Sequence, residues 1–209
     1  MNINKAIVIN LPEDTNRLKN TLESISSITS NIQIIKATKT VQHNMEVQFR
    51  NVAKLLGHCL SHLRALSFVE DNTLILEDDA RLLNKEDFIN LNLPEDWELC
   101  ALGVNIRNKP ILIKDNIYNI PKDSTCTFAY LIKNKEVADK IISHALRCLD
   151  NSWPDCVFDK IIFEGNYKCY SIYPAIFLPE AGPTTIWGGH RDNANIIKDS
   201  WRKYGSSIT

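Results

Sequence analysis

Three consecutive acidic residues, Glu77, Asp78 and Asp79, directly follow a short apolar run at residues 73–76. The run is partly β-branched, so it predicts a buried strand whose carboxyl end carries the acids. Side chains alternate along a strand, which would put Glu77 and Asp79 on one face and Asp78 on the other. Crowded carboxylates need either a cation or full solvation. Two of them at a strand end suit a hard divalent cation that also holds phosphates, and the alternative is a solvated acidic turn that opens a helix.

Two histidines, His58 and His62, are four residues apart and therefore face one way on a helix. This is a spacing that metal ligands use, but the glutamate of the H-E-x-x-H zinc-protease motif is missing between them. Zinc ligation is therefore the less favoured hypothesis. The favoured one is a pair of histidines that pack in the core or face a substrate.

Four further side chains are candidates for chemistry. Arg17 is a lone cation in the first predicted helix, where it could reach a phosphate, although a solvated helix residue is the favoured alternative. Asp155 and Asp159 are four residues apart on a predicted helix, and either could act as a general base or lie on a solvated face. His190 follows two glycines, and a neutral imidazole there could be a third metal ligand beside the carboxylates.

The elements that must position these residues follow from hydrophobic periodicity. Continuous apolar runs predict strands, and apolar residues every three or four positions predict helices. The first half of the chain gives the order strand, helix, strand, helix, strand at residues 6–9, 14–28, 32–35, 47–69 and 73–76. This order predicts an α/β fold with a parallel, doubly wound sheet of the Rossmann type.

The second half of the chain is predicted to add further strands and helices. Pro, Gly and Thr dominate from residue 174 on, so we expect an irregular C-terminal tail. The predicted strands are 99–104, 127–132 and 169–173, with a hairpin at 111–113 and 117–120, and the predicted helices are 85–91, 135–148 and 154–163.

Composition limits the function classes. The 209 residues suit one domain, and a net charge of −1 argues against a broad nucleic-acid-binding surface. The six cysteines form no C-x-x-C pair, which favours reduced thiols in a cytoplasmic protein. The sequence shows neither a signal peptide nor an apolar stretch near the ~20 residues that a membrane helix needs.

Several of these segments together resemble glycosyltransferase family 25, which includes lipooligosaccharide and collagen galactosyltransferases. The motifs occur in the family's order and cover most of the chain. They are IVINL at residues 7–11 followed by Arg17, GHCLSHL at 57–63, LEDDA at 76–80, AYLI at 129–132, and Pro154-Asp155 with Asp159.

The resemblance implies a GT-A-like fold, a UDP-sugar donor, a Mn²⁺ (or Mg²⁺) ion and inversion at the anomeric carbon. It implies transfer of a hexose, galactose first among them, to a glycan or lipid-linked glycan such as lipooligosaccharide. Asp79 is then the direct metal ligand, with Glu77 and His190 as further candidates. Asp155 is the preferred catalytic base and Asp159 the second choice. The residues expected to bind the donor are Asn10, Leu11, Arg17, Gly57, Ser61, His62, Glu77 and Asp78.

On this hypothesis residues 1–104 bind the nucleotide-sugar and residues 105–209 form the acceptor side and the tail of a single domain. Two alternatives stay open, a family member that binds nucleotide-sugar without transfer and a receiver-like signalling domain. A lipid-linked acceptor would place the protein at the inner face of the membrane. The basic and aromatic residues near the C-terminus, Lys198, Trp201, Arg202, Lys203 and Tyr204, could form a peripheral membrane contact, although a solvated basic end is the favoured alternative.

Overall fold

The computed structural model describes residues 1–40, 47–151, 158–183 and 190–205, and a mixed sheet runs through the middle of them. Its order is β2-β1-β3-β8-β5-β9-β7-β6, with eight strands in the described residues. The strands of the main sheet are β1 (Lys5–Asn10), β2 (Ile32–Lys36), β3 (Thr73–Glu77), β5 (Leu99–Ala101), β6 (Ile111–Lys114), β7 (Ile117–Asn119), β8 (Ala129–Ile132) and β9 (Cys169–Ile172).

The central strands are apolar because both of their faces are covered. Strand β8 is buried along its whole length, and in β3 only the final residue, Glu77, is partly exposed. Strand β1 pairs in parallel with β2 and with β3, as the predicted strand and helix order requires. Strands β8 and β7 run antiparallel to their neighbours, and the other strands share one direction. The predicted α/β class with a mainly parallel sheet is therefore confirmed.

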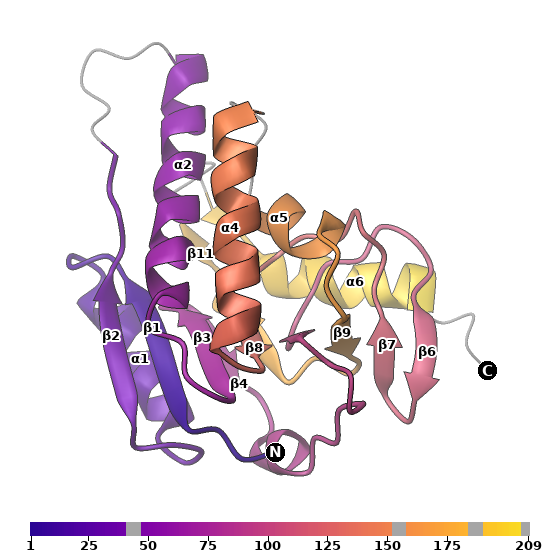
Figure 1. Cartoon of the computed structure of the whole chain (residues 1–209). Helices are drawn as coiled ribbons and strands as arrows, with labels where there is room; N and C mark the ends of the chain where they lie inside the picture. Colours follow the sequence, from indigo (N-terminus) through magenta and orange to yellow (C-terminus); the bar gives the residue numbers. More distant parts are fainter. Residues whose placement is uncertain (41–46, 152–157, 184–189, 206–209) are drawn as a thin grey trace.

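Helices cover both faces of the sheet. The long helices α2 (Val47–Leu66) and α4 (Lys135–Asn151) run side by side in front of it, and α1 (Thr15–Ile25) lies behind the first strands (Figure 1). Helix α2 turns the apolar side chains of Cys59, Leu63 and Leu66 inward, as its sequence period predicts. The shorter helices are α3 (Lys85–Ile89) and α5 (Phe158–Glu164).

The expectation of an irregular C-terminal tail is wrong. Strand β10 (Phe177–Pro179) pairs with β4 (Ala80–Leu82), and β11 (Gly182–Pro183) pairs with β12 (His190–Arg191). A helix, α6 (Asn193–Gly205), then lies behind the sheet (Figure 1). The proline and glycine before residue 190 drew the prediction away from local helix signals that are present, an Asp192 side chain that accepts a 3.0 Å hydrogen bond from the Asn195 N–H and buried Ile197 and Trp201 four residues apart.

The packing of α6 is centred on Trp201, which is 1% exposed. Its indole Nε1 donates a 2.9 Å hydrogen bond to the Val104 carbonyl, and its ring stacks on Tyr173 with centroids 4.7 Å apart. An indole held in this way is not available to a lipid interface. The predicted membrane contact through Trp201 is therefore wrong, whereas Lys198, Arg202 and Lys203 are exposed on α6 and Tyr204 is half-buried.

Other sequence predictions can be compared directly. The hairpin is confirmed as the antiparallel pair β6 and β7, and Cys100, Cys126, Cys148 and Cys169 are free thiols. The predicted helix at 154–163 is observed from Phe158, and its first residues lie outside the described part of the chain. None of the described helices combines the length and the apolar character that a membrane crossing needs.

Candidate active site

A cavity of about 900 Å³ opens at the carboxyl ends of β1 and β3. Ligands bind at this edge in open α/β sheets, and the volume lies in the range of small-molecule sites. The first half of the chain supplies walls from α1, α2 and residues 37–40. The second half supplies residues 123–128, α5 and residues 179–182. The acidic residues 77–79 line this cavity, as the sequence predicted for a ligand site.

Strand β3 ends at Glu77, and Asp78 and Asp79 form the turn into β4. The alternation of side chains stops where the strand stops, so the expectation that Glu77 and Asp79 share one face is wrong. Glu77 turns toward the histidines of α2, whereas Asp78 and Asp79 both turn toward Arg17 of α1. The acidic triplet is therefore divided between two groups of neighbours.

Arg17 bridges the two aspartates. Its Nη2 atom lies 3.0 Å from Asp78 Oδ1 and 2.8 Å from Asp79 Oδ2, and Nη1 lies 3.7 Å from Asp14. The side chain of Arg17 is 27% exposed, so the favoured alternative of a solvated helix residue is wrong. The guanidinium lines the cavity, where the resemblance places a nucleotide-binding residue.

The two aspartates are hard to ionise even with Arg17 beside them. Burial raises the pKa of Asp79 to about 7, and the neighbouring charge of Glu77 adds to the effect. Burial also raises the pKa of Asp78 to about 6, against the opposing charge of Arg17. Asp79 Oδ1 is buried and has no hydrogen-bond partner among the described residues. A divalent cation would both satisfy this oxygen and neutralise the excess negative charge, so these residues fit one.

The end of β1 holds the acidic turn and the adjacent loop in place. The Leu11 N–H donates a 3.3 Å hydrogen bond to Asp78 Oδ2, and Leu11 lines the cavity. Asn10 is buried, and its backbone carbonyl accepts a hydrogen bond from Ala37 N–H at 2.8 Å. Both contacts use backbone groups, and the roles of Asn10 and Leu11 in nucleotide binding stay predictions.

Gly57 and Ser61 of α2 fix the same loop from the other side. The Ser61 hydroxyl donates to the Gly57 carbonyl at 2.6 Å and accepts from the Thr38 N–H at 2.8 Å. Thr38 passes so close to Gly57 that a Cβ atom there would lie 2.6 Å from the Thr38 carbonyl oxygen. The helix motif therefore shapes the cavity wall at residues 38–40. A residue larger than glycine at position 57 would collide with the backbone of that wall.

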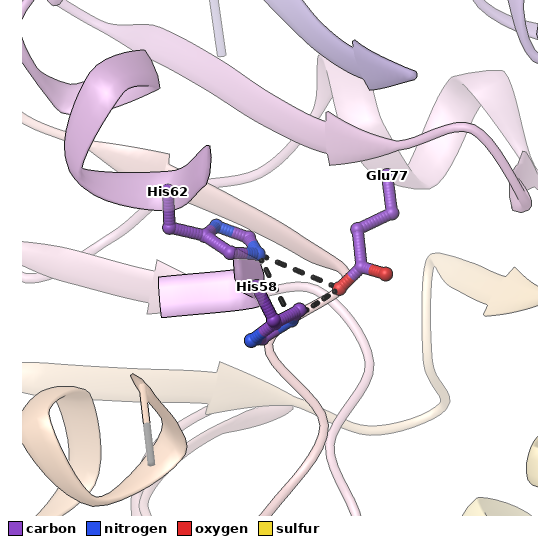
Figure 2. A group of neighbouring side chains, drawn as sticks. All are labelled: His58, His62 and Glu77. Atoms are coloured by element: carbon purple, nitrogen blue, oxygen red, sulfur yellow. Dashed lines mark hydrogen bonds and ion pairs between the residues drawn. The ribbon is translucent and has the colours of Figure 1, made fainter. Parts of the chain in front are cut away.

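Figure 2 shows His58, His62 and Glu77 converging on one point of the cavity wall. Glu77 Oε1 lies 3.1 Å from His58 Nε2 and 3.5 Å from His62 Nε2. His62 is fully buried, its ring stacks on Phe158 at 4.3 Å, and its Nδ1 lies 2.9 Å from the Tyr130 hydroxyl. The histidines are thus both packed and cavity-facing, the alternatives that the sequence favoured.

The pKa of Glu77 is shifted in the opposite direction to those of Asp78 and Asp79. Burial and the neighbouring His58 lower the pKa of His62 to about 4, so this imidazole is neutral. Burial opposes ionisation of Glu77 too, but hydrogen bonds with His58 and His62 bring the pKa of Glu77 below its usual range. Glu77 is therefore a carboxylate at neutral pH.

Of the two candidate bases and the candidate ligand His190, the structure describes Asp159 and His190. Asp155 lies outside the described residues. Asp159 lines the cavity, and its two oxygens accept hydrogen bonds from the Cys126 N–H at 3.1 Å and the Thr127 hydroxyl at 2.7 Å. His190 is exposed in β12, and the structure does not bring it to the acidic residues. Its role as a metal ligand stays a prediction.

Some cavity residues had no signal in the sequence. Three cations line the cavity from separate parts of the chain, Lys54 of α2, Arg107 between β5 and β6, and Lys160 of α5. Arg81 forms an ion pair with Glu180, whose N–H also donates a 2.8 Å hydrogen bond to the Asp79 carbonyl. These residues come from distant parts of the chain, so no local spacing could have shown that they meet.

Neither a protein-family model nor a curated protein matches this sequence. Solved structures do match. The galactosyltransferase LgtC, solved with donor and acceptor sugar analogues, is 12% identical with a TM-score of 0.50, over 98% of this chain and 96% of LgtC. The fold is of the GT-A type. At this identity the similarity concerns the fold alone.

Two other similar structures are of glycosyltransferases. GlyE of Streptococcus pneumoniae TIGR4 has a TM-score of 0.49 and 13% identity over 97% of this chain. The match covers 64% of GlyE, so this chain spans about two thirds of that protein's length. A glycosyltransferase involved in glycosylation of the major capsid of PBCV-1 has a TM-score of 0.45 and 12% identity, over 95% of this chain and 98% of that one.

Proposed function

We propose that the protein is a metal-dependent, inverting glycosyltransferase of the family 25 type that uses a UDP-hexose, with UDP-galactose first among the donors. The observation that supports this most is Asp79, whose Oδ1 is buried without a partner among the described residues, in a cavity at the carboxyl ends of β1 and β3. A divalent cation would satisfy this oxygen, and the diphosphate of a nucleotide-sugar is the ligand that such a cation would share.

In the proposed complex the uridine diphosphate lies against Leu11, Arg17 and residues 38–40. Asp79 would hold Mn²⁺ or Mg²⁺ directly, with Asp78 beside it. In the structure Arg17 forms ion pairs with both aspartates. In the complex its guanidinium would also contact the diphosphate. The bound cation supplies Lewis-acid stabilisation of the negative charge that develops on the leaving diphosphate.

Transfer with inversion is one displacement. The acceptor hydroxyl oxygen bonds to the anomeric carbon while the bond from that carbon to the diphosphate oxygen breaks. The hydroxyl proton must go to a base on the opposite side of the sugar from the leaving group. We propose the Asp155 carboxylate for this role. Asp159 is the second choice, because both of its oxygens already accept hydrogen bonds from residues 126 and 127.

We propose that residues 1–104 bind the donor and residues 105–209 face the acceptor within one domain. The cavity supports this division, since the two halves of the chain form separate parts of its wall. The acceptor would be a glycan or a lipid-linked glycan such as lipooligosaccharide, reached from the cytoplasmic side of the membrane. The receiver-like alternative gains no support, because β1 and β2 precede the acidic strand in the same sheet.

Isothermal titration calorimetry with UDP tests the donor site. We expect Mn²⁺ to raise the affinity of the protein for UDP at least about tenfold, and Asp79→Asn to remove that gain. Asp87→Asn, at an exposed acid on α3, is the matched control and should keep it. Metal-independent or absent UDP binding by the natural protein would overturn the proposal.

Mass spectrometry of reactions with mixed UDP-sugars and a panel of glycan acceptors tests the transfer itself. A product that gains one hexose identifies the donor and the acceptor class together. Binding of UDP with Mn²⁺ but no transfer or donor hydrolysis would instead identify a family member that binds nucleotide-sugar without transferring it.

A further inference from the structure

We propose that His58, His62 and Glu77 form a zinc site that is separate from the donor metal site at Asp79. The proposal goes beyond the proposed function and does not depend on it. It assigns Glu77 to the imidazoles of α2 rather than to the cation of the aspartates. Both sites line the same cavity but take their ligands from different elements.

The three ligand atoms already stand at the spacing of a zinc coordination shell. His58 Nε2 and Glu77 Oε1 are 3.1 Å apart, the two Nε2 atoms 3.2 Å, and His62 Nε2 and Glu77 Oε1 3.5 Å. A tetrahedral zinc ion with ligands at about 2.0–2.1 Å holds its ligand atoms about 3.3 Å apart. The triangle in Figure 2 therefore matches one face of such a tetrahedron with little movement of the side chains.

The ligands are mounted on rigid elements. His58 and His62 are successive turns of α2, and Glu77 is the last residue of β3. The Tyr130 hydroxyl bonds to Nδ1 of His62, which fixes the ring and leaves Nε2 for the metal. Phe158 stacks on the same ring. Pre-set ligands with a supporting partner are typical of metal sites in proteins.

Without a cation, no placement of protons satisfies all three contacts. Protons on both Nε2 atoms give Glu77 two donors but leave two N–H groups facing each other at 3.2 Å. A proton on His58 Nε2 alone leaves the His62 lone pair facing the carboxylate oxygen at 3.5 Å. A single cation uses all three lone pairs at once.

The ligand types distinguish this site from the donor metal site. Two imidazoles and one carboxylate favour zinc over manganese or magnesium, which prefer oxygen ligands. The aspartates at residues 78 and 79 offer oxygen alone, so the two sites have different preferences. Three protein ligands leave the fourth position of a tetrahedral ion open. Because all three residues line the cavity, that position can take a water or hydroxyl oxygen from it.

Cobalt substitution tests the site in the full-length chain without nucleotide. Tetrahedral Co²⁺ with nitrogen ligands absorbs visible light far more strongly than Co²⁺ in an octahedral oxygen site. We expect one equivalent of Co²⁺ with the tetrahedral spectrum, which Zn²⁺ displaces and Mn²⁺ does not. Glu77→Gln and His58→Asn should each weaken Zn²⁺ binding at least about 100-fold in competition with a chelator.

Two control variants decide the location. Asp79→Asn should retain the tetrahedral spectrum, since it alters only the donor site. His144→Asn, at a histidine that bonds to the Tyr167 hydroxyl away from the cavity, should retain it as well. Circular dichroism and thermal unfolding check that each variant folds. If His58→Asn does not fold, Glu77→Gln, which keeps the size of the side chain, tests the site alone.

The proposal is overturned if the natural protein binds no stoichiometric Zn²⁺ or if Glu77→Gln binds it unchanged. It is also overturned if Asp79→Asn abolishes the cobalt spectrum, because the ion would then occupy the donor site. Each result is independent of the calorimetry with UDP and Mn²⁺, so failure of the zinc site and failure of the proposed transferase function are distinguishable.

Discussion

Glu77 and Asp79 are two residues apart, yet they lie in opposite chemical surroundings. Glu77 meets two imidazoles of α2, and its pKa is held below the usual range by their hydrogen bonds, despite burial. Asp79 meets the Arg17 guanidinium of α1 and keeps one unpartnered oxygen, and burial raises its pKa to about 7. One carboxylate is thus fully ionised at neutral pH while the other is half protonated in the absence of a metal.

The difference shows that one acidic motif can be divided between two sets of neighbours. The end of β3 sets the division, because the chain leaves the strand after Glu77 and turns through Asp78 and Asp79. Each carboxylate then takes its chemistry from the helix that faces it. A carboxylate beside two imidazoles offers the mixed nitrogen and oxygen ligands that zinc accepts. Two carboxylates offer only oxygen ligands, which manganese and magnesium prefer.

The largest effect on sugar transfer is expected from the catalytic base. This base should be separate both from the residues around Glu77 and from those around Asp79. Asp155→Asn should lower sugar transfer by about two to four orders of magnitude, the usual contribution of a general base. Mn²⁺-dependent UDP affinity should not change, because the donor groups remain intact. Steady-state kinetics and calorimetry on the same preparation measure both quantities.

Asp159→Asn is the matched comparison for Asp155→Asn. Because Asp159 holds residues 126 and 127, its replacement should lower the melting temperature as well as turnover. Near-normal transfer by Asp155→Asn together with loss in Asp159→Asn would reverse the assignment. If both variants stay active, the next candidate base is Glu180, a carboxylate that also lines the cavity.

The pH dependence of donor binding should separate the two carboxylates. A cation at Asp79 must displace the proton whose pKa is about 7, so Mn²⁺-dependent UDP affinity should fall about tenfold per pH unit below 7. The charge of Glu77 contributes to that raised pKa. Glu77→Gln should therefore shift the midpoint to lower pH, as titrations between pH 5 and 8 would show. An unshifted midpoint would mean that the two groups are electrostatically independent.

A smaller effect is expected from the loop next to the donor side. Gly57→Ala would place a Cβ atom 2.6 Å from the Thr38 carbonyl oxygen, so residues 38–40 must move. We expect about a tenfold loss of UDP affinity, in line with overpacking costs of about 1–3 kcal/mol. Gly182→Ala is the control, because no atom lies within 4 Å of the added Cβ. Loss of zinc binding in Gly57→Ala would show that the loop and the imidazoles are coupled.

The smallest effects are on stability, and they should have opposite signs. The pKa of Asp79 is raised from 3.8 to about 7, so this group lowers the stability of the metal-free fold progressively as the pH rises from about 4 to 7, and the full penalty is present above pH 7. Asp79→Asn should raise the melting temperature at pH 8 by about 5 °C, and the gain should vanish as the pH falls toward 4.

Glu77→Gln should lower the melting temperature instead. The pKa of Glu77 is depressed in the folded protein, so its charge stabilises the fold above the unfolded value of 4.5. That contribution is lost as the pH falls below this value toward the folded pKa. Differential scanning calorimetry at pH 8 without metal compares the two variants, and shifts of the same sign would contradict the division of the acidic motif.

The sequence by itself determined the first half of the fold. Apolar runs and helical stripes are local patterns, and they predicted β1, α1, β2, α2 and β3 in order. Their parallel pairing followed from that order, because strands joined through helices run the same way. The same logic placed the acidic residues at a ligand-binding edge of the sheet, where the cavity is observed.

Only the tertiary structure decided which side chains meet at that edge. The ion pairs of Arg17 with two aspartates, the packing of α6 through Trp201 and the hydrogen bonds of Asp159 join residues that are distant in sequence. The imidazoles of His58 and His62 had a visible spacing, but their partner Glu77 comes from a different element. Local periodicity fixes the direction of a side chain only within its own helix or strand, so contacts between elements depend on how those elements pack.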